Sequence, residues 1–352
     1  MVAPSRHRCR RARPYAPLIN DDEEVPASRS ARGSTLRRGG LVVVWGSLGV
    51  IAAFTVARLL GFTDRSPRPF ALATLTPWLL APTATLFAAA LALRSRSLVL
   101  SALTVAIVIG VATAPDLRWW PAERATSAQG SFVVAAANIG ATNDRRQEVA
   151  EALWALESDV LVVVELTPAA QEAIVSNGAI AGYPHRVEDP REGFYGSAIY
   201  SRYPVIDSDV ISVAGSPMTR ATIALPGGSA TVIAVHTVQP LAGLDSLRSQ
   251  LAALDELAES SSIPVILAGD FNATRQHGPF RELLDDGFTD AHLSTGRGWA
   301  ATWPTGRRVP PFALLDRVIV SAAFTARHTS EVTVPGSDHK AVVAHLGWSA
   351  AG

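Results

Sequence analysis

Three long, uncharged apolar stretches in the first third of the chain constrain its fold more than any other feature. They cover residues 41–57, 70–93 and 97–115 of a 352-residue sequence. A helix needs about 20 apolar residues to cross a bilayer, with about 17 as the lower limit, so all three are long enough. A cleaved signal peptide would explain only one of them. We therefore expect three transmembrane helices, at about 41–60, 70–93 and 97–115.

The placement of arginine predicts how these helices are oriented. Residues 1–40 carry nine arginines against four acids, and Arg94 and Arg96 lie in the link between the second and third stretches. An excess of basic residues marks the cytoplasmic side of a membrane protein. We expect a multi-pass protein of the cell membrane with a disordered, basic cytoplasmic tail over 1–40 and an extracytoplasmic part after residue 116. If one stretch were instead a helix of a soluble core, this topology would be reversed.

The part of the chain beyond the apolar stretches is acidic. From residue 131 onward there are 15 basic and 24 acidic residues, a net charge of −9, which the first 130 residues balance with a net charge of +9. Neutralisation of phosphates by basic residues dominates the affinity of proteins for duplex DNA, so this domain is not an obvious DNA binder. The only cysteine, Cys9, lies in the tail, so the domain contains neither a disulfide nor a thiol nucleophile.

Strands and helices alternate after a predicted linker over residues 116–130. Short apolar runs, such as residues 160–164 and 263–268, are typical of buried strands. Helical spacing places Leu244, Leu247, Leu251 and Leu254 on one face between two such runs. Strands joined by both hairpins and helices predict an α/β fold with two stacked sheets and helices outside them. We expect this two-sheet α/β sandwich to span residues 131–348.

Polar side chains recur at the ends of the predicted strands. Charged groups in apolar surroundings are costly unless they are paired or bound to a metal. Two of these residues, Asp270 and Asn272, are two positions apart and therefore point the same way on an extended segment. We expect all of them to converge on one rim suited to metal-assisted attack on a phosphate; they are Asn138, Glu165, His236, Asp270, Asn272, Asp316, Asp338 and His339.

The sequence segments around these residues, in their order along the chain, resemble the endonuclease/exonuclease/phosphatase superfamily, which has the deoxyribonuclease I-like fold. Among the matching segments, Gly269-Asp270-Phe271-Asn272 and Ser337-Asp338-His339 contain four of the eight candidate residues. The resemblance covers residues 132–346 and no part of the apolar region. It implies a two-sheet sandwich with an active site at one edge, in agreement with the pattern of strands.

The resemblance also implies a metal site. Carried over residue by residue, Glu165 is the expected principal Mg²⁺ ligand, with Asn138 beside it and Asp338 nearby. Carboxylate and amide oxygens without cysteine favour Mg²⁺ or Mn²⁺ over zinc.

Catalytic roles follow from the same resemblance. Asp270 is expected to orient or deprotonate the attacking water, and Asn272 to bind the phosphate. His339, oriented by Asp316, is expected to contact the scissile phosphate, while His236 stabilises or protonates the leaving oxygen. The sequence leaves open whether Asp270 or His339 acts as the base.

Two neighbouring features remain open. Arg317 follows Asp316 where many relatives carry histidine or tyrosine, a difference that could alter substrate contacts. The loop with Thr302-Trp303-Pro304 and Arg307-Arg308 is either a flank of the site or an ordinary surface loop.

The predicted function is a membrane-tethered, metal-dependent phosphoesterase that hydrolyses a phosphodiester with an activated water. The substrate would be nucleic acid or, alternatively, the head group of a phospholipid or sphingolipid, or a phosphomonoester. From a different class, a catalytically idle binding or scaffold protein could keep the same fold. Besides this substrate, the sequence indicates the lipid bilayer as a partner and predicts no protein partner.

Overall fold

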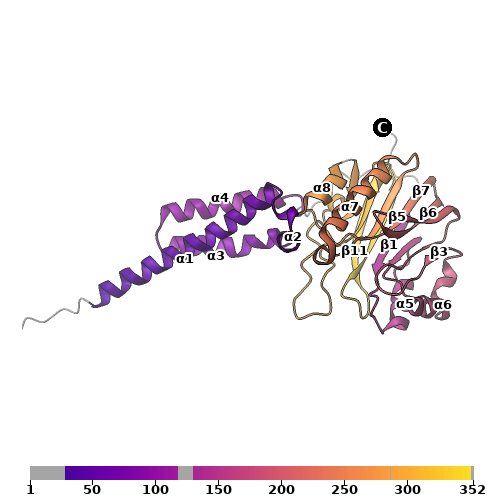
Figure 1. Cartoon of the computed structure of the whole chain (residues 1–352), viewed down its shortest axis with the longest axis horizontal. Helices are drawn as coiled ribbons and strands as arrows, with labels where there is room; N and C mark the ends of the chain where they lie inside the picture. Colours follow the sequence, from indigo (N-terminus) through magenta and orange to yellow (C-terminus); the bar gives the residue numbers. More distant parts are fainter. Residues whose placement is uncertain (1–27, 118–129, 286, 350–352) are drawn as a thin grey trace, which may run out of the picture.

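The computed structural model describes residues 28–117, 130–285 and 287–349, which form a helical bundle at one end and an α/β unit at the other (Figure 1). Most of the predicted tail and of the predicted linker lies outside the described residues. The last part of the predicted tail does not fit that expectation, because α1 (Ser28–Leu59) begins at residue 28. Extending an existing helix requires no new nucleation, which explains how an apolar helix continues into a polar segment.

The bundle consists of α1, α3 (Leu80–Ala92) and α4 (Arg96–Thr113). Thr35–Leu59 and Arg96–Thr113 are long and apolar enough to cross a membrane. Their outward faces are apolar as well, since large hydrophobic side chains such as Val43 and Val111 remain exposed to 65 % and 71 %. An exposed apolar surface of this extent is unusual for a protein surrounded by water and suggests association with a membrane.

The apolar stretch over residues 70–93 is not the single helix that we expected. It is divided into α2 (Pro67–Ala73), the short 3₁₀ helix η2 (Thr76–Leu79) and α3, with a bend of 65° at the break. Pro77 contributes to the break, because it has no backbone N–H to donate to the Ala73 carbonyl four residues earlier, and that carbonyl accepts from Thr76 Oγ1 instead. The described residues therefore contain two unbroken candidate spans, and a third only if the bent pair is taken together.

The α/β unit contains two sheets, as predicted, and each sheet has six strands. The strand order of the first sheet is β11-β12-β1-β2-β4-β3, and that of the second is β5-β6-β7-β8-β10-β9. The strands of the first sheet are β1 (Phe132–Asn138), β2 (Val160–Val164), β3 (His185–Asp189), β4 (Ser197–Ser201), β11 (Phe324–Thr333) and β12 (Lys340–Trp348). The strands of the second are β5 (Val205–Val213), β6 (Ser216–Leu225), β7 (Gly228–His236), β8 (Val265–Asp270), β9 (Phe288–Asp290) and β10 (Asp316–Ser321).

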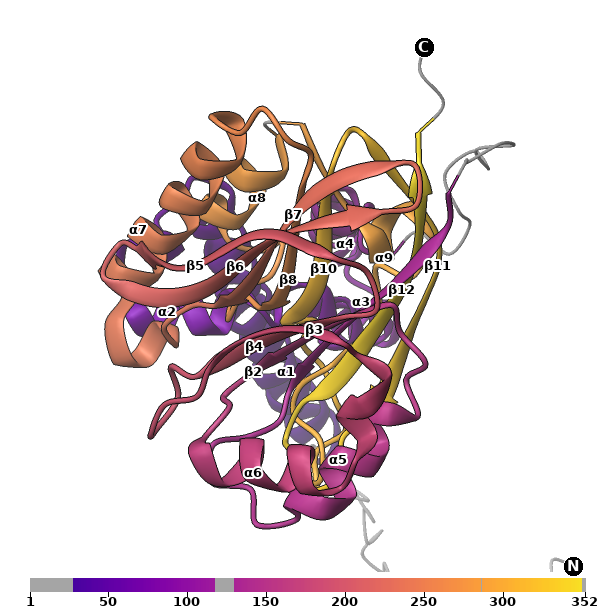
Figure 2. The same ribbon diagram turned by 90° about the vertical axis from the view of Figure 1, so that its right-hand side faces the viewer.

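Helices cover the outer faces of both sheets (Figure 2). The helices α5 (Arg146–Trp154) and α6 (Pro168–Ser176), with η3 (Ala179–Gly182), cover the first sheet, and α7 (Pro240–Glu259) and α8 (Gly278–Asp285) cover the second. Alternation along each strand builds three apolar layers: Val134 faces the other sheet, whereas its neighbour Ala135 faces the helices. The short elements η1 (Thr63–Arg65) and α9 (Ala291–Ser294) complete the described fold.

The pairing of the strands brings the predicted site residues to one edge. β1 and β2 are parallel, as are β7 and β8, so their carboxyl ends meet at the same side. β10 runs antiparallel to β8, which places Asp316 at the start of β10 opposite Asp270 at the end of β8. β12 runs antiparallel to β1, so the residues before Lys340 reach the same edge.

Candidate active site

Two carboxylates, one from each sheet, are joined by a single amide at this edge. Asn138 ends β1, and its Nδ2 donates to Glu165 Oε1 (2.9 Å) and to Asp270 Oδ2 (3.2 Å). The Gly140 backbone N–H donates to Asn138 Oδ1 (3.0 Å) and fixes the orientation of the amide. The Ala141 N–H donates to Glu165 Oε2 (2.7 Å). Asn138 therefore presents its NH₂ group, and not its oxygen, to the two carboxylates.

Asp270 and Asn272 lie next to each other, but they meet through a turn and not along the extended segment that we expected, because β8 ends at Asp270. The Asn272 backbone N–H donates to Asp270 Oδ1 (2.8 Å), and Asn272 Nδ2 donates to the Thr237 carbonyl (2.8 Å). Glu165 and Asn272 have φ values of +59° and +46°, in the left-handed region that residues other than glycine rarely occupy. Such strain is often found at functional sites, where the surrounding fold holds it in place.

A glycine lets β8 approach β7 directly before Asp270. Gly269 has a φ of +140°, and a Cβ at this position would lie 2.0 Å from the Val235 carbonyl oxygen. No other residue fits this close approach of two backbones.

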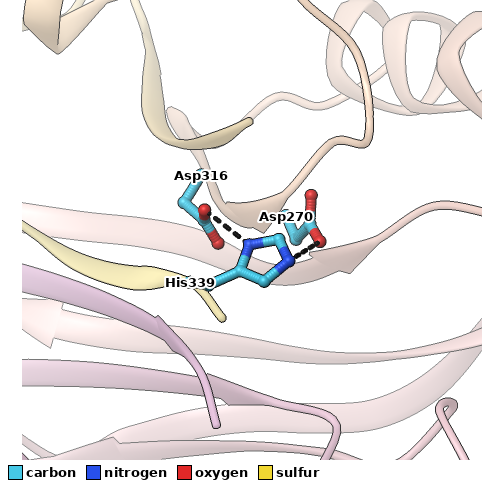
Figure 3. Close-up of side chains that lie close together, drawn as sticks. All are labelled: Asp270, Asp316 and His339. Atoms are coloured by element: carbon cyan, nitrogen blue, oxygen red, sulfur yellow. Dashed lines mark hydrogen bonds and ion pairs between the residues drawn. The ribbon is translucent and has the colours of Figure 1, made fainter. Parts of the chain in front are cut away.

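His339 lies between two carboxylates, those of Asp316 and Asp270 (Figure 3). His339 Nδ1 donates to Asp316 Oδ2 (2.8 Å), and His339 Nε2 lies 3.7 Å from Asp270 Oδ2. The Asp316 backbone N–H donates to Thr302 Oγ1 (3.1 Å), which anchors the start of β10. Burial alone would lower the pKa of His339, but the charges of Asp316 and Asp270 outweigh it and raise that pKa to about 10. His339 is therefore a cation at neutral pH, placed among carboxylates.

The second histidine faces the same carboxylates. His236 Nδ1 donates to the Phe194 carbonyl (2.7 Å), which orients the ring. His236 Nε2 lies 3.6 Å from Glu165 Oε1 and 3.9 Å from Asp270 Oδ2. Both histidines thus turn their Nε2 atoms toward Asp270.

Asp338 occupies a more open part of the site, with its side chain exposed to 40 %. Its Oδ2 accepts hydrogen bonds from Trp303 Nε1 (3.3 Å) and Arg307 Nη2 (3.4 Å), and its Oδ1 lies 3.9 Å from His339 Nε2. Of the two interpretations of the 302–308 loop, the structure supports the one in which it flanks the site.

Arg317 does not face the site. Its side chain is buried, forms an ion pair with Asp290 and donates from Nη2 to the Leu314 carbonyl (3.0 Å). Its guanidinium carbon lies 4.7 Å from the centre of the Phe280 ring. Because successive residues of a strand point to opposite faces, the orientation of Asp316 into the site sends Arg317 away from it. Arg317 therefore does not contact a substrate at this edge, which decides the possibility that the sequence left open.

Two contributions to the site were not predicted. Ser337 Oγ donates to the Asn138 carbonyl (2.8 Å) and accepts from the His339 N–H (3.0 Å), so it connects the end of β1 to the segment before β12. The only sequence signal for this role is its place in the Ser-Asp-His segment. The second contribution comes from α2, because Leu72 and Leu75 line the same cavity of about 1010 Å³ as Glu165.

The chemistry of these residues suits a hard divalent cation. The donors are carboxylates with a neighbouring amide, and none is a thiolate. Within the described residues, the buried Asp316 Oδ1 has no hydrogen-bond partner, and carboxylate oxygens of Asp270 and Asp316 lie within 4.8 Å of each other. A cavity rich in carboxylates repels an anionic phosphate unless a cation offsets the charge.

The fold is shared with several solved structures. An endonuclease/exonuclease/phosphatase from Beutenbergia cavernae is similar at 20 % identity and a TM-score of 0.51, over 63 % of this chain and 73 % of that one. D. rerio TDP2 complexed with a single-strand DNA product is similar at 17 % identity and a TM-score of 0.52, over 62 % and 99 %. A Bacteroides vulgatus endonuclease/exonuclease/phosphatase reaches 17 % and 0.53, over 62 % and 100 %.

Sequence comparison identifies the family. No curated protein matches the sequence. The family model described as "Endonuclease/Exonuclease/phosphatase family" matches residues 135–339, which is more than half of the chain and includes every candidate site residue. The protein belongs to the endonuclease/exonuclease/phosphatase family.

Proposed function

We propose that this chain is a membrane-tethered, divalent-metal-dependent phosphoesterase whose catalytic domain, residues 131–348, lies outside the cytoplasm. The observation that carries the proposal is the meeting of Glu165, His236, Asp270 and His339 at one edge of the sandwich. Membership of a family of nucleases and phosphatases supports hydrolysis of a phosphoester bond. The similar structure with a single-strand DNA product is consistent with such chemistry on this fold.

Glu165 is the residue we expect to hold the metal, Mg²⁺ or Mn²⁺, with Asp338 nearby. Ala141 and Asn138 orient the Glu165 carboxylate through hydrogen bonds to its two oxygens. Such outer partners set the direction of a metal ligand. When bound, the ion supplies Lewis-acid polarisation of a phosphoryl oxygen and offsets the negative charge that develops there.

The remaining residues divide the proton transfers between them. A water oxygen forms a bond to phosphorus while the bond from phosphorus to the leaving oxygen breaks. Asp270 accepts the proton of that water, since the positive charge of His339 leaves the neighbouring carboxylate as the base.

The histidines act on the phosphate and the leaving group. His339 donates from Nε2 to a phosphoryl oxygen, and Asp316 holds its ring through Nδ1. His236 has its Nδ1–H held by the Phe194 carbonyl, so Nε2 is the ring nitrogen that faces the leaving oxygen. It stabilises that oxygen or, when the ring carries a proton on both nitrogens, donates the proton that leaves with the alcohol. Asn272 is held at the rim, where its amide can contact the phosphate.

The geometry of the helical bundle supports the proposed tether. Arg58, in the last turn of α1, donates to the Gln276 carbonyl (3.2 Å). Asp116, which follows α4, accepts from Nε2 of the same Gln276 (2.5 Å). The C-terminal ends of the two candidate spans therefore lie on the same side of the bundle. Three crossings of a membrane require this arrangement, with α2 and α3 together carrying the chain back between α1 and α4. The nine arginines of residues 1–40 favour a cytoplasmic N-terminus.

Hydrolysis of bis(p-nitrophenyl) phosphate by the purified full chain tests the catalytic part of the proposal. We expect Glu165→Gln to lower kcat at least about 100-fold in Mg²⁺. Glu148→Gln is the matched control, because Glu148 lies on the surface, with its side chain exposed to 51 % in a pair with Arg145. Wild-type activity in Glu165→Gln would contradict the proposed metal ligand.

The only cysteine offers a direct test of topology. Cys9 lies in the basic tail and is expected in the cytoplasm. A membrane-impermeant maleimide should label it only after the cells are opened. Cys9→Ser with Ser208→Cys, at an exposed position of β5, should be labelled in intact cells. The opposite pattern would reverse the proposed orientation.

A further inference from the structure

The active-site cavity has one wall that does not belong to the α/β sandwich. Four residues of α2 and the turn after it line the cavity, namely Ala71, Leu72, Thr74 and Leu75. Glu165, Asn272 and His339 line the same cavity. An element between two candidate membrane spans therefore takes part in the substrate site.

The catalytic domain holds α2 firmly. Phe70 is fully buried in the apolar layer beneath α7 and α8, and its ring stacks on His277 with 3.7 Å between the centres. His277 Nδ1 accepts from the Thr274 N–H (2.9 Å), so its Nε2 carries the proton that is donated to the Phe70 carbonyl (2.8 Å). Thr274 follows Asn272 by only two residues, which fixes the position of α2 relative to the catalytic edge.

The ends of the candidate spans meet the same short segment. Arg58, near the end of α1, is only 4 % exposed and donates to the Gln276 carbonyl. Asp116, just after α4, pairs with Arg275 (3.4 Å) and accepts from Gln276. The bundle axis therefore ends at the segment that follows the catalytic strand β8, as Figure 1 shows for the junction beside α2. The cavity lies at the boundary between the apolar bundle and the catalytic domain.

Exposed apolar side chains surround this part of the cavity. Leu72 of α2, Leu241 of α7 and Phe194 line it and are exposed to 52 %, 66 % and 52 %. Phe312 also lines the cavity, and its carbonyl accepts from Trp78 Nε1 (3.1 Å), whose ring lies 5.0 Å from that of Trp299. Half-exposed tryptophans with one polar contact are typical of the interface between membrane and water.

The charge of the domain does not favour a nucleic acid in this place. The chain from residue 131 onward has a net charge of −9, whereas affinity for a polyanion depends on basic residues along its backbone. A single phosphoryl group needs only the local site. A cavity of about 1010 Å³ is at the upper end of small-molecule sites and holds more than a phosphate.

We propose that the substrate is a membrane amphiphile with a phosphoester in its head group, whose apolar part lies against α2. Its phosphoryl group would reach Glu165, Asp270 and His339, while its hydrocarbon follows Leu72 and Leu75 toward the bilayer. This inference rests on the proposed function and assigns α2 to substrate recognition.

Two synthetic diesters with the same reacting bond separate recognition from chemistry. Hexadecyl p-nitrophenyl phosphate and ethyl p-nitrophenyl phosphate release the same leaving group and differ only in the alkyl chain. The full chain in detergent micelles with Mg²⁺ should hydrolyse the hexadecyl diester with a kcat/KM at least about 100-fold higher, since each buried methylene favours binding. A single-stranded oligonucleotide serves as the competing substrate.

Substitution of the α2 wall tests the same point on the protein side. Leu72→Asn should lower the ratio of the two kcat/KM values about tenfold, because it removes apolar surface that would contact the hexadecyl chain. The variant should still fold, since about half of the Leu72 side chain is already exposed. Leu60→Asn is the matched control: Leu60 is 63 % exposed, lies near the end of the first candidate span and does not line the cavity, so the ratio should not change.

Each outcome bears on a different claim. A hexadecyl diester that is no better than the ethyl diester, or an oligonucleotide that is cleaved faster than both, would overturn the membrane substrate and leave the phosphoesterase standing. An unchanged ratio in Leu72→Asn would remove α2 from recognition. If none of the three substrates is hydrolysed, the proposed function itself fails, and the inference with it.

Discussion

The pairing of Asp316 with His339 allows a quantitative test of the proposed mechanism. Asp316→Asn removes the negative charge but keeps an oxygen that can accept from His339 Nδ1. The present contact is a charge-assisted hydrogen bond of 2.8 Å between buried groups, and bonds of this kind contribute about 1.5–3 kcal/mol. If that energy orients the ring in the transition state, kcat should fall about 10- to 150-fold, with KM little changed.

The pH profile distinguishes orientation and charge from simple loss of structure. In the wild type, the charges of Asp316 and Asp270 outweigh burial and raise the pKa of His339 to about 10, so the ring stays protonated at neutral pH. Removing the Asp316 charge lowers this pKa toward its ordinary value. The alkaline limb of the kcat profile should therefore move to lower pH in the variant.

Initial rates on bis(p-nitrophenyl) phosphate across the pH range provide the assay. Asp209→Asn is a suitable control, because Asp209 forms an ion pair with Arg220 (2.7 Å) on a surface where its side chain is 44 % exposed. That variant should keep the wild-type rate and profile. Wild-type kcat and an unmoved alkaline limb in Asp316→Asn would refute the orienting role.

Two further predictions concern stability. Gly269→Ala should destabilise the catalytic domain by about 2–5 kcal/mol in chemical unfolding, because the new Cβ would meet the β7 backbone at 2.0 Å. Gly193→Ala should cost less, about 1–2 kcal/mol, because open space surrounds Gly193 and only its φ of +78° opposes a side chain. Burial raises the pKa of Glu331, but its contacts with His292 and Arg297 outweigh burial and lower it to about 2. Because the pKa of Glu331 is lower in the folded state, ionised Glu331 stabilises the fold at pH values above the ordinary carboxylate pKa of 4.5. This stability is lost as the pH falls from 4.5 toward 2, so the unfolding midpoint should decrease over that range. Glu331→Gln should weaken this pH dependence. Equal midpoints for the two glycine variants, or a wild-type midpoint that is constant over this pH range, would contradict these assignments.

The gathering of the candidate residues at one edge was predictable, because polar residues at the ends of apolar strands are a strong sequence signal. Runs such as residues 263–268 are apolar enough to identify as buried strands. A carboxylate directly after such a run is energetically unfavourable unless it is paired or bound to a metal. The parallel pairing of β1 with β2 and of β7 with β8 then brings Asn138 and Glu165 to the same edge as Asp270. This part of the site depends on local sequence and on a general rule of sheets.

The role of α2 could not be read from hydropathy. Residues 70–93 are uniformly apolar, and a side chain buried against protein has the same hydropathy as one in lipid. Phe70 is buried against the catalytic domain, far along the chain from its partner His277, and only the tertiary structure brings the two together. The orientation of Arg317 was missed for a related reason, because it depends on which face Asp316 takes.

The central claim is that a divalent cation and the Asp270 edge together hydrolyse a phosphoester. The most direct measurement is the initial rate of bis(p-nitrophenyl) phosphate hydrolysis by the full chain in Mg²⁺, after excess chelator, and after Mg²⁺ is restored, for the wild type and Asp270→Asn. We predict hydrolysis that disappears with chelator, returns with Mg²⁺ and is lost in Asp270→Asn under all three conditions. A wild-type rate that persists in excess chelator, or an Asp270→Asn variant as active as the wild type, would contradict the account.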